Sequence, residues 1–500
     1  MVIEKQEKEK GQPILKNRYR TMPARRVAFI AVRAGIVLQP DGERLDLGQS
    51  LTMKDVLEVV EAEDLDVVYI VGCWNAASTP RTEWFVAPET WERATYHRNP
   101  LVASYRKKIG GRKVSVYGSA QWFGQCGKIE LVMAAYKRLQ ALVKGAFGDH
   151  AFLLGTPART GLDLVERSLP LNRDKVPYEW PVLPQDVREI IEHNIGQGRM
   201  EMLRQGPKTP QADRLYIQDA FWLYAALCRR LPSGPCQHDT LAEFGEYRPG
   251  FYRVLFQVPV EWRHIGLLPT WNPKDRKTVW PSRPSTYWYE SVCCPEELRL
   301  AQEQNWPVQI KERWLWNQGD DLAHDPLRNW IGKLREMRDR VTAERDGAEI
   351  APLLRSAIRS LVIKAIGGLH RKGRYRMMET PMERLADIPE DADIVWQTDQ
   401  IIRWHKPIPL DSHMAHFAHP EWSATIWGRA RALLARRALE VPRECIIALR
   451  SDAMALTFDP GWKAEKPGQF RLKRTIELAG RALPVSTRDY LDLLQDEEED

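Results

Sequence analysis

The chain has 500 residues, enough for roughly two to four domains, and its 43% hydrophobic and 28% charged residues are typical of a globular protein. No apolar stretch approaches the roughly 20 residues of a membrane span, and the charged N-terminus has no signal-peptide core, so we expect no membrane partner and a cytoplasmic location. Seven scattered cysteines without metal-ligand spacing argue against a structural zinc site.

The net charge is +6, and its distribution in basic clusters is compatible with a nucleic-acid partner. Basic clusters stand at Arg371–Arg376 and Arg429–Arg437, and several of the 19 tryptophans are next to basic residues. Such pairs can stack on bases and contact phosphates. The alternative is that the clusters are solvated helix faces and the tryptophans belong to the core.

The first 150 residues predict a charged arm and one α/β domain. Residues 1–23 are polar and predict a flexible arm. Apolar runs at 26–32, 66–72 and 113–117 predict strands, and helical spacing over 128–147 predicts a helix that ends near Gly148. We therefore expect a first domain over 24–150.

The middle of the chain predicts a linker and a strand-rich domain. Prolines and glycines punctuate residues 151–213, which we interpret as an ordered linker, with a helix at 185–194, that enters the next domain. Strand-rich sequence follows over 214–316.

Two amphipathic patterns predict an αα-hairpin within residues 317–374. The first helix spans 325–344 and the second spans 350–366, with a turn at Asp346-Gly347 and a C-cap at Gly367-Gly368. A third domain segment spans 375–475 and includes a helix at 420–439, and residues 476–500 end in an acidic tail.

Two aspartates are the first candidates for chemistry. Asp219 lies in the apolar run Leu215–Tyr224, and Asp452 lies in the apolar run Cys445–Leu456. Each run predicts a buried strand, where a carboxylate is costly unless a cation or hydrogen-bond donors compensate it. If the strands are neighbours, a divalent ion between the carboxylates would offset their repulsion. The alternative is that each aspartate caps a turn at a strand end.

Arg355 and Arg359 are the first candidates for phosphate binding. Their i, i+4 spacing places them on one face of the second hairpin helix, where both guanidinium groups can reach a triphosphate. The alternative is that they pair on the surface with Glu344 or Glu349.

Three segments in this order resemble the motifs of family B DNA polymerases, particularly the protein-primed and mobile-element branch. Asp219 and Tyr224 match the aspartate and tyrosine of the first polymerase motif. Aligned on Gly367, Arg359 takes the place of the lysine in the fingers motif, while isoleucines replace its asparagine and tyrosine. Arg450-Ser-Asp452 resembles the third motif, an Asp-x-Asp hairpin whose first aspartate is here an arginine.

Further segments support the resemblance, which covers about residues 150–475. Gly198-Arg199 with Glu201 resembles the loop that joins the exonuclease and polymerase parts, and Gly468–Lys473 resembles the basic segment that contacts primer DNA. Connecting stretches at 247–252, 289–301 and 423–431 follow in the expected order.

The resemblance implies an α/β protein of the polymerase right-hand type. Its palm has an antiparallel sheet in two parts, 214–316 and 375–475, its fingers are the helical hairpin of 317–374, and its N-terminal domain is of the ribonuclease-H-like exonuclease type. It also implies the partners DNA primer-template, dNTP and a terminal protein or other replication factor, and the cofactor Mg²⁺ or Mn²⁺. The implied site residues are Asp219 and Asp452 for metal binding and catalysis, Tyr224, Arg355, Arg359 and Gly367 for the nucleotide, and Gly198, Arg199, Arg471 and Lys473 for DNA.

Departures from the family pattern leave a second function open. Arg33-Ala-Gly35 stands where the exonuclease places its metal-binding carboxylates, so we expect no proofreading, and residues 476–500 are too short for a full thumb. Arg450 would share a strand face with Asp452 and occupy the space of a metal ion. The chain is then either a polymerase that serves a phage, plasmid or mobile element, or an inactive polymerase-fold protein that binds nucleic acid or initiates replication. An unrelated α/β protein is a third possibility.

Overall fold

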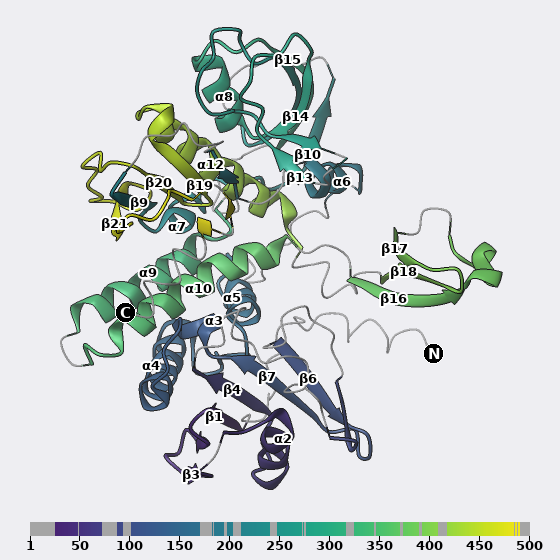
Figure 1. The fold of residues 1–500 in the computed structure, drawn as a ribbon, viewed down its shortest axis with the longest axis vertical. Helices are drawn as coiled ribbons and strands as arrows, with labels where there is room; N and C mark the ends of the chain where they lie inside the picture. Colours follow the sequence, from purple (N-terminus) through teal and green to yellow (C-terminus); the bar gives the residue numbers. More distant parts are fainter. Residues whose placement is uncertain are drawn as a thin grey trace, which may run out of the picture. The chain divides into compact units, whose positions relative to one another are not determined.

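The chain folds into two compact units. The computed structural model describes residues 26–48, 50–72, 88–93, 102–170, 183, 185–194, 198–203, 212–240, 248–272, 274, 277–316, 325–344, 347–370, 374–389, 393–408, 418–484, 486–487 and 489–490. Unit 1 comprises Met1–Tyr178 and Leu327–Ala365, and unit 2 comprises Glu179–Pro326 and Ile366–Asp500. The chain therefore leaves unit 1 and returns to it (Figure 1).

A seven-stranded mixed sheet forms the centre of unit 1, with the order β3-β2-β1-β4-β7-β6-β5. β1 is parallel to β4 and β4 to β7, and the other neighbours are antiparallel. The strands are β1 Val27–Ala31, β2 Ile36–Leu38, β3 Arg44–Asp46, β4 Val67–Val71, β5 Trp91–Arg93, β6 Val102–Lys107 and β7 Lys113–Gly118. The three strands predicted in this region are β1, β4 and β7.

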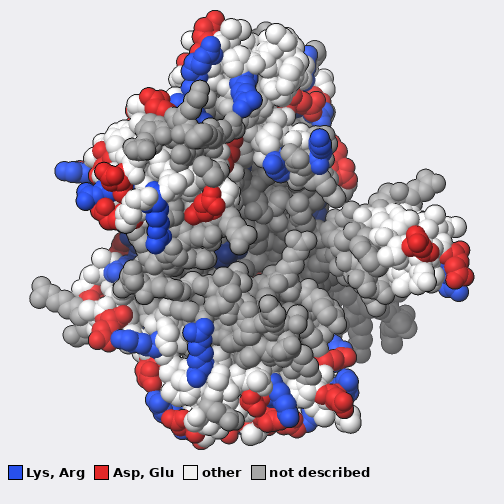
Figure 2. Space-filling model, in the orientation of Figure 1, with Lys and Arg blue, Asp and Glu red and all other residues white. Residues whose placement is uncertain are grey.

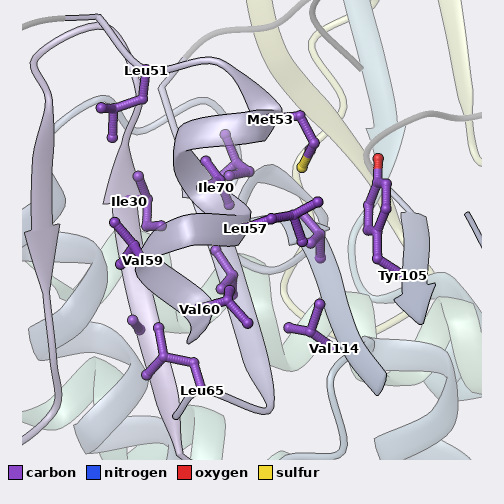
Figure 3. Packing of buried hydrophobic residues seen from close by; sticks show 14 of the residues in the cluster. Ile30, Leu51, Met53, Leu57, Val59, Val60, Leu65, Ile70, Tyr105 and Val114 are labelled. Carbon is purple, nitrogen blue, oxygen red and sulfur yellow. The ribbon is translucent and has the colours of Figure 1, made fainter. Parts of the chain in front are cut away.

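Helices cover both faces of this sheet, which is why β1 and β4 are buried throughout. On one face, α2 (Met53–Ala62) packs residues such as Leu57 and Val60 against Ile30 and Ile70 (Figure 3). The helix begins at a capping box between Thr52 and Asp55, which satisfies its free N–H groups.

On the other face of the sheet, α4 (Ile129–Phe147) packs Tyr136 against Phe29, with ring centroids 5.2 Å apart. α4 is the helix predicted over 128–147, and it ends at Gly148, whose φ of +98° favours glycine. The short α3 (Ala120–Phe123) precedes it.

The described part of the region predicted as a linker contains α5 (Pro157–Glu166) in addition to the predicted helix. Thr156 caps it and Pro157 occupies its first turn, a start signal that the prolines and glycines nearby obscured.

The predicted αα-hairpin is present as α9 (Arg328–Ala343) and α10 (Ala351–Leu369). The expected C-cap at Gly367-Gly368 is wrong, because α10 continues through both glycines to Leu369. Ile366 and Leu369 are each 1% exposed. Burial of two such side chains outweighs the roughly 1 kcal/mol that each helical glycine costs.

The hairpin belongs to unit 1 through contacts with α4 and α5. The Lys333 ammonium lies 5.0 Å from the centroid of the Phe147 ring, and Arg138 pairs with Glu344. A side chain at Gly161 in α5 would lie 2.7 Å from the Ala365 Cβ of α10, so the glycine permits a close helix crossing.

Unit 2 contains a five-stranded antiparallel sheet of order β21-β9-β20-β19-β8. Its strands are β8 Met200–Met202, β9 Arg214–Ala220, β19 Ile446–Arg450, β20 Ala453–Leu456 and β21 Phe470–Glu477. One face carries an apolar cluster that includes Leu215, Ile217, Ala455, Ile476 and Tyr490.

A second antiparallel sheet in unit 2 has the order β10-β15-β11-β14. Its strands are β10 Cys236–Asp239, β11 Gly250–Phe256, β14 Tyr289–Cys293 and β15 Val308–Trp316, and a hairpin of β12 (Thr270–Asn272) and β13 (Lys277–Val279) adjoins β14. A third sheet, β16-β18-β17, comprises Arg374–Pro381, Ile401–Ile408 and Asp393–Gln397.

Helix α12 (Pro420–Ala438) lies between the two larger sheets of unit 2 and contacts both β20 and the helix α8 (Pro295–Glu303). Fully buried Arg431 pairs with Glu297 of α8 at 2.8 Å, and Arg429 pairs with Glu296 at 2.7 Å. This part of a predicted nucleic-acid cluster therefore serves helix packing, which corrects the expectation. Unit 2 also contains α6 Gln185–Asn194, α7 Leu223–Leu227, η3 Met382–Asp387 and η4 Arg443–Cys445.

Both apolar runs that carry the aspartates are shorter strands than predicted. β9 ends at Ala220, and Tyr224 lies in α7 after Trp222, which has left-handed φ and ψ of 52° and 36°. The second run is a hairpin, with β19 and β20 joined at Ser451 and Asp452. An apolar run does not reveal such a turn because its flanking strands are both buried.

Candidate functional site

The two aspartates lie on neighbouring parts of the five-stranded sheet. Asp219, near the end of β9, pairs directly with Ala453, the residue that follows Asp452. The Ala220 N–H donates to the Asp452 carbonyl oxygen at 2.8 Å, which fixes the end of β9 beside the hairpin turn. The sheet thus brings together two residues that are 233 positions apart in the sequence.

The Asp219 carboxylate is buried among cations. Asp219 as a whole is 9% exposed. Its Oδ1 atom is buried and accepts no hydrogen bond from the described residues. On the neighbouring strand β21, the Arg471 Nε lies 4.0 Å from Oδ1 and the Lys473 Nζ lies 3.5 Å from Oδ2. These ion pairs compensate the buried charge, as the sequence argument required.

Arg471 and Lys473 are positioned by β21 itself. Arg471 pairs directly with Asp219, and its guanidinium lies 4.5 Å from the centroid of the Phe221 ring. A β-bulge between Leu472 and Arg474 inserts Lys473 as an extra residue, which turns its ammonium toward Asp219 as well. Both side chains are about half exposed, so they also face solvent.

The turn that carries Asp452 is held by the Gly198-Arg199 segment. The Ser451 N–H donates to the Arg199 carbonyl oxygen at 2.6 Å. A side chain at Gly198 would lie 3.0 Å from the Ser451 Oγ, so only glycine fits there without displacement. Ser451 has a φ of +56°, a conformation that non-glycine residues rarely adopt without such support.

The Arg199 guanidinium is bound inside the protein. It is 1% exposed, donates to the Glu201 carboxylate at 2.6 Å and the Gly266 carbonyl at 2.8 Å, and lies 5.1 Å from the centroid of the Trp280 ring. Its expected contact with DNA stays a prediction. What the structure describes is a residue that positions the hairpin turn.

Arg450 does not share a strand with Asp452, which corrects the expectation that a period of two places them on one face. Asp452 lies in the turn, where that period does not apply. The Arg450 guanidinium lies 6.0 Å from the centroid of the Tyr490 ring. Burial raises the pKa of the Tyr490 hydroxyl, and the nearby guanidinium of Arg450 opposes that shift.

A row of directly paired residues crosses this end of the sheet. It runs from Met200 in β8 through Arg450, Ala453 and Asp219 to Arg471 in β21. Directly paired residues share a face of the sheet. Asp219 is therefore the one carboxylate in a row that also holds two arginines, and all three lie beyond the apolar cluster of the same face.

The predicted nucleotide-binding residues are on helices. Tyr224 is buried in α7, five residues after Asp219. Arg355 and Arg359 are both exposed on α10, opposite its buried residues, as the i, i+4 spacing predicts. Glu344, a suggested surface partner, pairs with Arg138 instead. Arg355 and Arg359 belong to unit 1 and the aspartates to unit 2, so their convergence stays a prediction.

Comparisons with known proteins identify the fold. Phi29 DNA polymerase bound to primer-template DNA and incoming nucleotide is similar to this chain with a TM-score of 0.57 and 11% identity, over 91% of this chain and 86% of that one. The binary complex of phi29 DNA polymerase with primer-template DNA gives 0.56 and 12%, over 91% and 85%. The chain has a DNA polymerase-like fold. No family model and no curated protein sequence matches it, so it is a divergent example of that fold.

The Asp219 carboxylate has the chemistry of a divalent-metal ligand, and Asp452 lies in the neighbouring hairpin turn. Mg²⁺ is held in phosphate-transfer sites by one or two carboxylates, with water and substrate phosphates as the other ligands. The Asp219 Oδ1, buried and without a hydrogen bond from the described residues, is a ligand atom of that type. Within the described ranges, no three or more His, Cys, Asp or Glu side chains are grouped so that they could hold a metal ion.

The sequence alone did not reveal the contacts of Asp219 with Arg471 and Lys473. Both residues were predicted, but as DNA contacts, because pairing of β9 with β21 is a long-range property. The signal that was present is the apolar–basic pattern of β21, in which Phe470 and Ile476 are buried and the basic residues Arg471, Lys473 and Arg474 lie between them.

The described surface carries both signs of charge. Figure 2 shows Lys and Arg side chains interspersed with Asp and Glu over the face that it draws. None of the helices that the structure describes has the length and apolarity to cross a membrane.

Proposed function

We propose that this chain is a template-directed DNA polymerase that transfers a nucleotide from dNTP to a 3′-hydroxyl. One observation carries the proposal. In a polymerase-like fold, the strand of Asp219 pairs with the hairpin whose turn holds Asp452. Nucleotidyl transfer requires carboxylates fixed on rigid elements at this kind of position.

Each aspartate has a defined part in this proposal. Asp219 and Asp452 would hold Mg²⁺ or Mn²⁺, which when bound supplies charge neutralisation for the triphosphate and the attacking hydroxyl. Arg471 and Lys473, which pair with Asp219 in this structure, would contact the phosphates of primer-template DNA. Gly198 and Arg199 fix the turn of Asp452 beside that DNA.

The nucleotide is the second partner. Arg355 and Arg359 on the exposed face of α10 neutralise its β- and γ-phosphates, Gly367 on the same helix lets it approach, and Tyr224 packs under its sugar. No described residue lies within 4 Å of a side chain placed at Gly367, which supports this part of the proposal. A terminal protein or another replication factor, a phage, plasmid or mobile-element origin and a cytoplasmic location complete the proposal and rest on the family resemblance.

We infer that the sheet of unit 1 is an exonuclease-type domain without proofreading. β1 is followed by Val32 and exposed Arg33, and the segment from Val27 to Pro40 has no carboxylate. A two-metal nuclease needs carboxylates on such a strand. Incubation of the chain with end-labelled single-stranded DNA and Mg²⁺ tests this inference, which expects that the DNA is not shortened.

A second candidate function is an inactive polymerase-fold protein that binds nucleic acid. The ion pairs of Asp219 with Arg471 and Lys473 favour it, because cations already occupy the surroundings of the carboxylate. On this alternative the sheet binds the DNA backbone, and no nucleotide is transferred.

Primer extension separates the two. A labelled primer on a template is incubated with dNTPs and Mg²⁺ or Mn²⁺, and the wild-type chain is compared with Asp452→Asn. The polymerase proposal expects extension by the wild type and a loss of at least a hundredfold in the variant. Asp213→Asn, at an exposed aspartate just before β9, is the matched control and should extend like the wild type.

Two results would reject the polymerase. One is a wild-type chain that binds primer-template DNA but incorporates no nucleotide, which selects the second candidate. The other is equal extension by the wild type and Asp452→Asn.

A further inference from the structure

A second surface of unit 2 has the composition of a nucleic-acid site. Among the described residues, the exposed large aromatic side chains are Trp271, Tyr287 and Trp288, with 36, 62 and 38% exposure. All three lie in the segment that forms the β12–β13 hairpin and leads into β14. We call these three residues the aromatic platform.

The Tyr287 ring is the exposed end of a series of aromatic rings that contact one another. Its centroid lies 4.7 Å from that of Tyr289, and the two hydroxyl groups are hydrogen bonded at 2.7 Å. Tyr289 stacks on buried Phe256 at 5.4 Å, and Phe256 stacks on Trp306 at 5.7 Å. An exposed ring that is anchored in this way loses little conformational entropy when a ligand stacks on it.

The backbone around Tyr287 is fixed as well. The Ser285 Oγ donates to the Tyr287 carbonyl oxygen at 2.7 Å, and the Gln257 side chain donates to the Thr286 carbonyl oxygen at 2.9 Å. The Thr270 Oγ1 donates to the Glu290 carbonyl oxygen at 2.6 Å, which ties the strand of Trp271 to β14. The platform is therefore part of a rigid surface.

The charge of this segment selects an anionic partner. Residues 262–289 contain five basic residues and one aspartate. Four of the basic residues, Arg263, Lys274, Lys277 and Arg283, are exposed. Rings that offer a flat face and cations beside them match a strand whose bases are unpaired, because each base offers a face for stacking and each phosphate a charge. A duplex keeps its base faces stacked on one another and offers only the phosphates.

The platform also has a physical connection to the candidate site. The Arg199 guanidinium bonds to Gly266 and lies on the Trp280 ring, both in the segment of the β12–β13 hairpin. The same residue holds the Ser451 turn through its carbonyl oxygen. Arg199 thus contacts both the segment that carries the platform and the turn of Asp452.

We propose that the aromatic platform binds single-stranded nucleic acid, with bases stacked on Tyr287 and Trp271 and phosphates on the neighbouring lysines and arginines. The site is separate from the two aspartates and does not depend on catalysis. It would hold an unpaired strand that enters or leaves the five-stranded sheet.

Fluorescence anisotropy of a labelled oligo-dT of about 20 nucleotides tests the proposal on the full chain at fixed salt. We expect Tyr287→Ala and Trp271→Ala each to weaken binding roughly tenfold, the effect of one lost stacked base. Tyr287→Phe keeps the ring and should bind within about twofold of the wild type. Leu385→Ala, at an exposed apolar residue of η3 that is 50% exposed, is the control for loss of apolar surface.

The outcome that overturns the proposal is oligo-dT binding by the two alanine variants that equals the wild type. Equal weakening for a blunt duplex of the same length, or for a poly-glutamate peptide, would also overturn it, because the platform would then be a general anion surface. Failure of the polymerase proposal is a separate result, the absence of primer extension by a wild-type chain that still binds oligo-dT through the platform.

Discussion

The Lys473 ammonium can form an ion pair with either Asp219 or a DNA phosphate. The salt dependence of primer-template binding distinguishes the two. If it contacts a phosphate in the complex, we expect Lys473→Gln to weaken primer-template binding and to reduce the slope of log K against log salt by about 0.9, the value for one phosphate. The physical reason is that the variant neutralises one phosphate fewer, so its binding releases one condensed counterion fewer from the DNA. The measurement is a titration at several salt concentrations without dNTP.

Lys54→Gln is the charge-matched control for this experiment. Lys54 is exposed on α2 of unit 1 and pairs only at 3.9 Å with Glu58, so its loss changes the net charge equally. A slope that Lys473→Gln leaves unchanged would mean that this lysine stays with Asp219 in the complex.

His264 gives unit 2 a pH dependence. Burial lowers the pKa of its imidazole, and the nearby guanidinium groups of Arg443 and Arg199 lower it further, while its hydrogen bond to the Val441 carbonyl oxygen at 2.9 Å opposes the shift. The unfolded chain therefore binds a proton more readily than the folded one, and the free energy of unfolding falls as pH falls through about 6.5. We expect Tm at pH 5.5 to fall less, relative to pH 7.5, in His264→Gln than in the wild type. Identical falls would contradict this assignment.

At the scale of elements, α12 is joined to α8 by three ion pairs of different burial, Arg429–Glu296, Arg431–Glu297 and Arg436–Glu303. Arg431 and Glu297 are each 1% exposed, whereas Arg436 and Glu303 are 54 and 39% exposed. Removing one partner of a buried pair leaves an uncompensated charge, so we expect Arg431→Met to cost about 3–5 kcal/mol of unfolding free energy. Arg436→Met should cost at most about 1 kcal/mol.

Urea unfolding at neutral pH measures both variants. The double variant Glu297→Met with Arg431→Met should recover much of the loss, because no buried charge remains. Similar losses for Arg431→Met and Arg436→Met would show that burial of this pair is not what stabilises the helix contact.

At the scale of the whole molecule, local sequence patterns predict helices and strands better than they predict which strands pair with one another. The helices α4, α6 and α12 were predicted near their observed ends because each carries its own apolar period and stop signals. The turn at Ser451 was missed because nothing in its apolar flanks marks it. The pairing of Asp219 with Ala453 and Arg471 depends on strand register across more than 200 residues, which no local pattern encodes.

The same long-range character governs the stability of unit 1. The chain returns to this unit at α9 and α10, where Trp330, Leu334 and Leu361 are fully buried. Full burial of each such side chain contributes about 1.5–3 kcal/mol, and a domain has only about 5–15 kcal/mol in total. We therefore expect a fragment of residues 24–178 to bind the dye ANS and to lack a cooperative thermal transition. The same fragment joined through a Gly/Ser linker to residues 325–370 should unfold cooperatively.

Gly161→Val in the joined fragment should abolish this cooperative unfolding, because a valine side chain would prevent the close approach of α5 to Ala365. A cooperative transition in the short fragment at the same midpoint would mean that the first domain is independent of the hairpin, as the sequence boundaries predict.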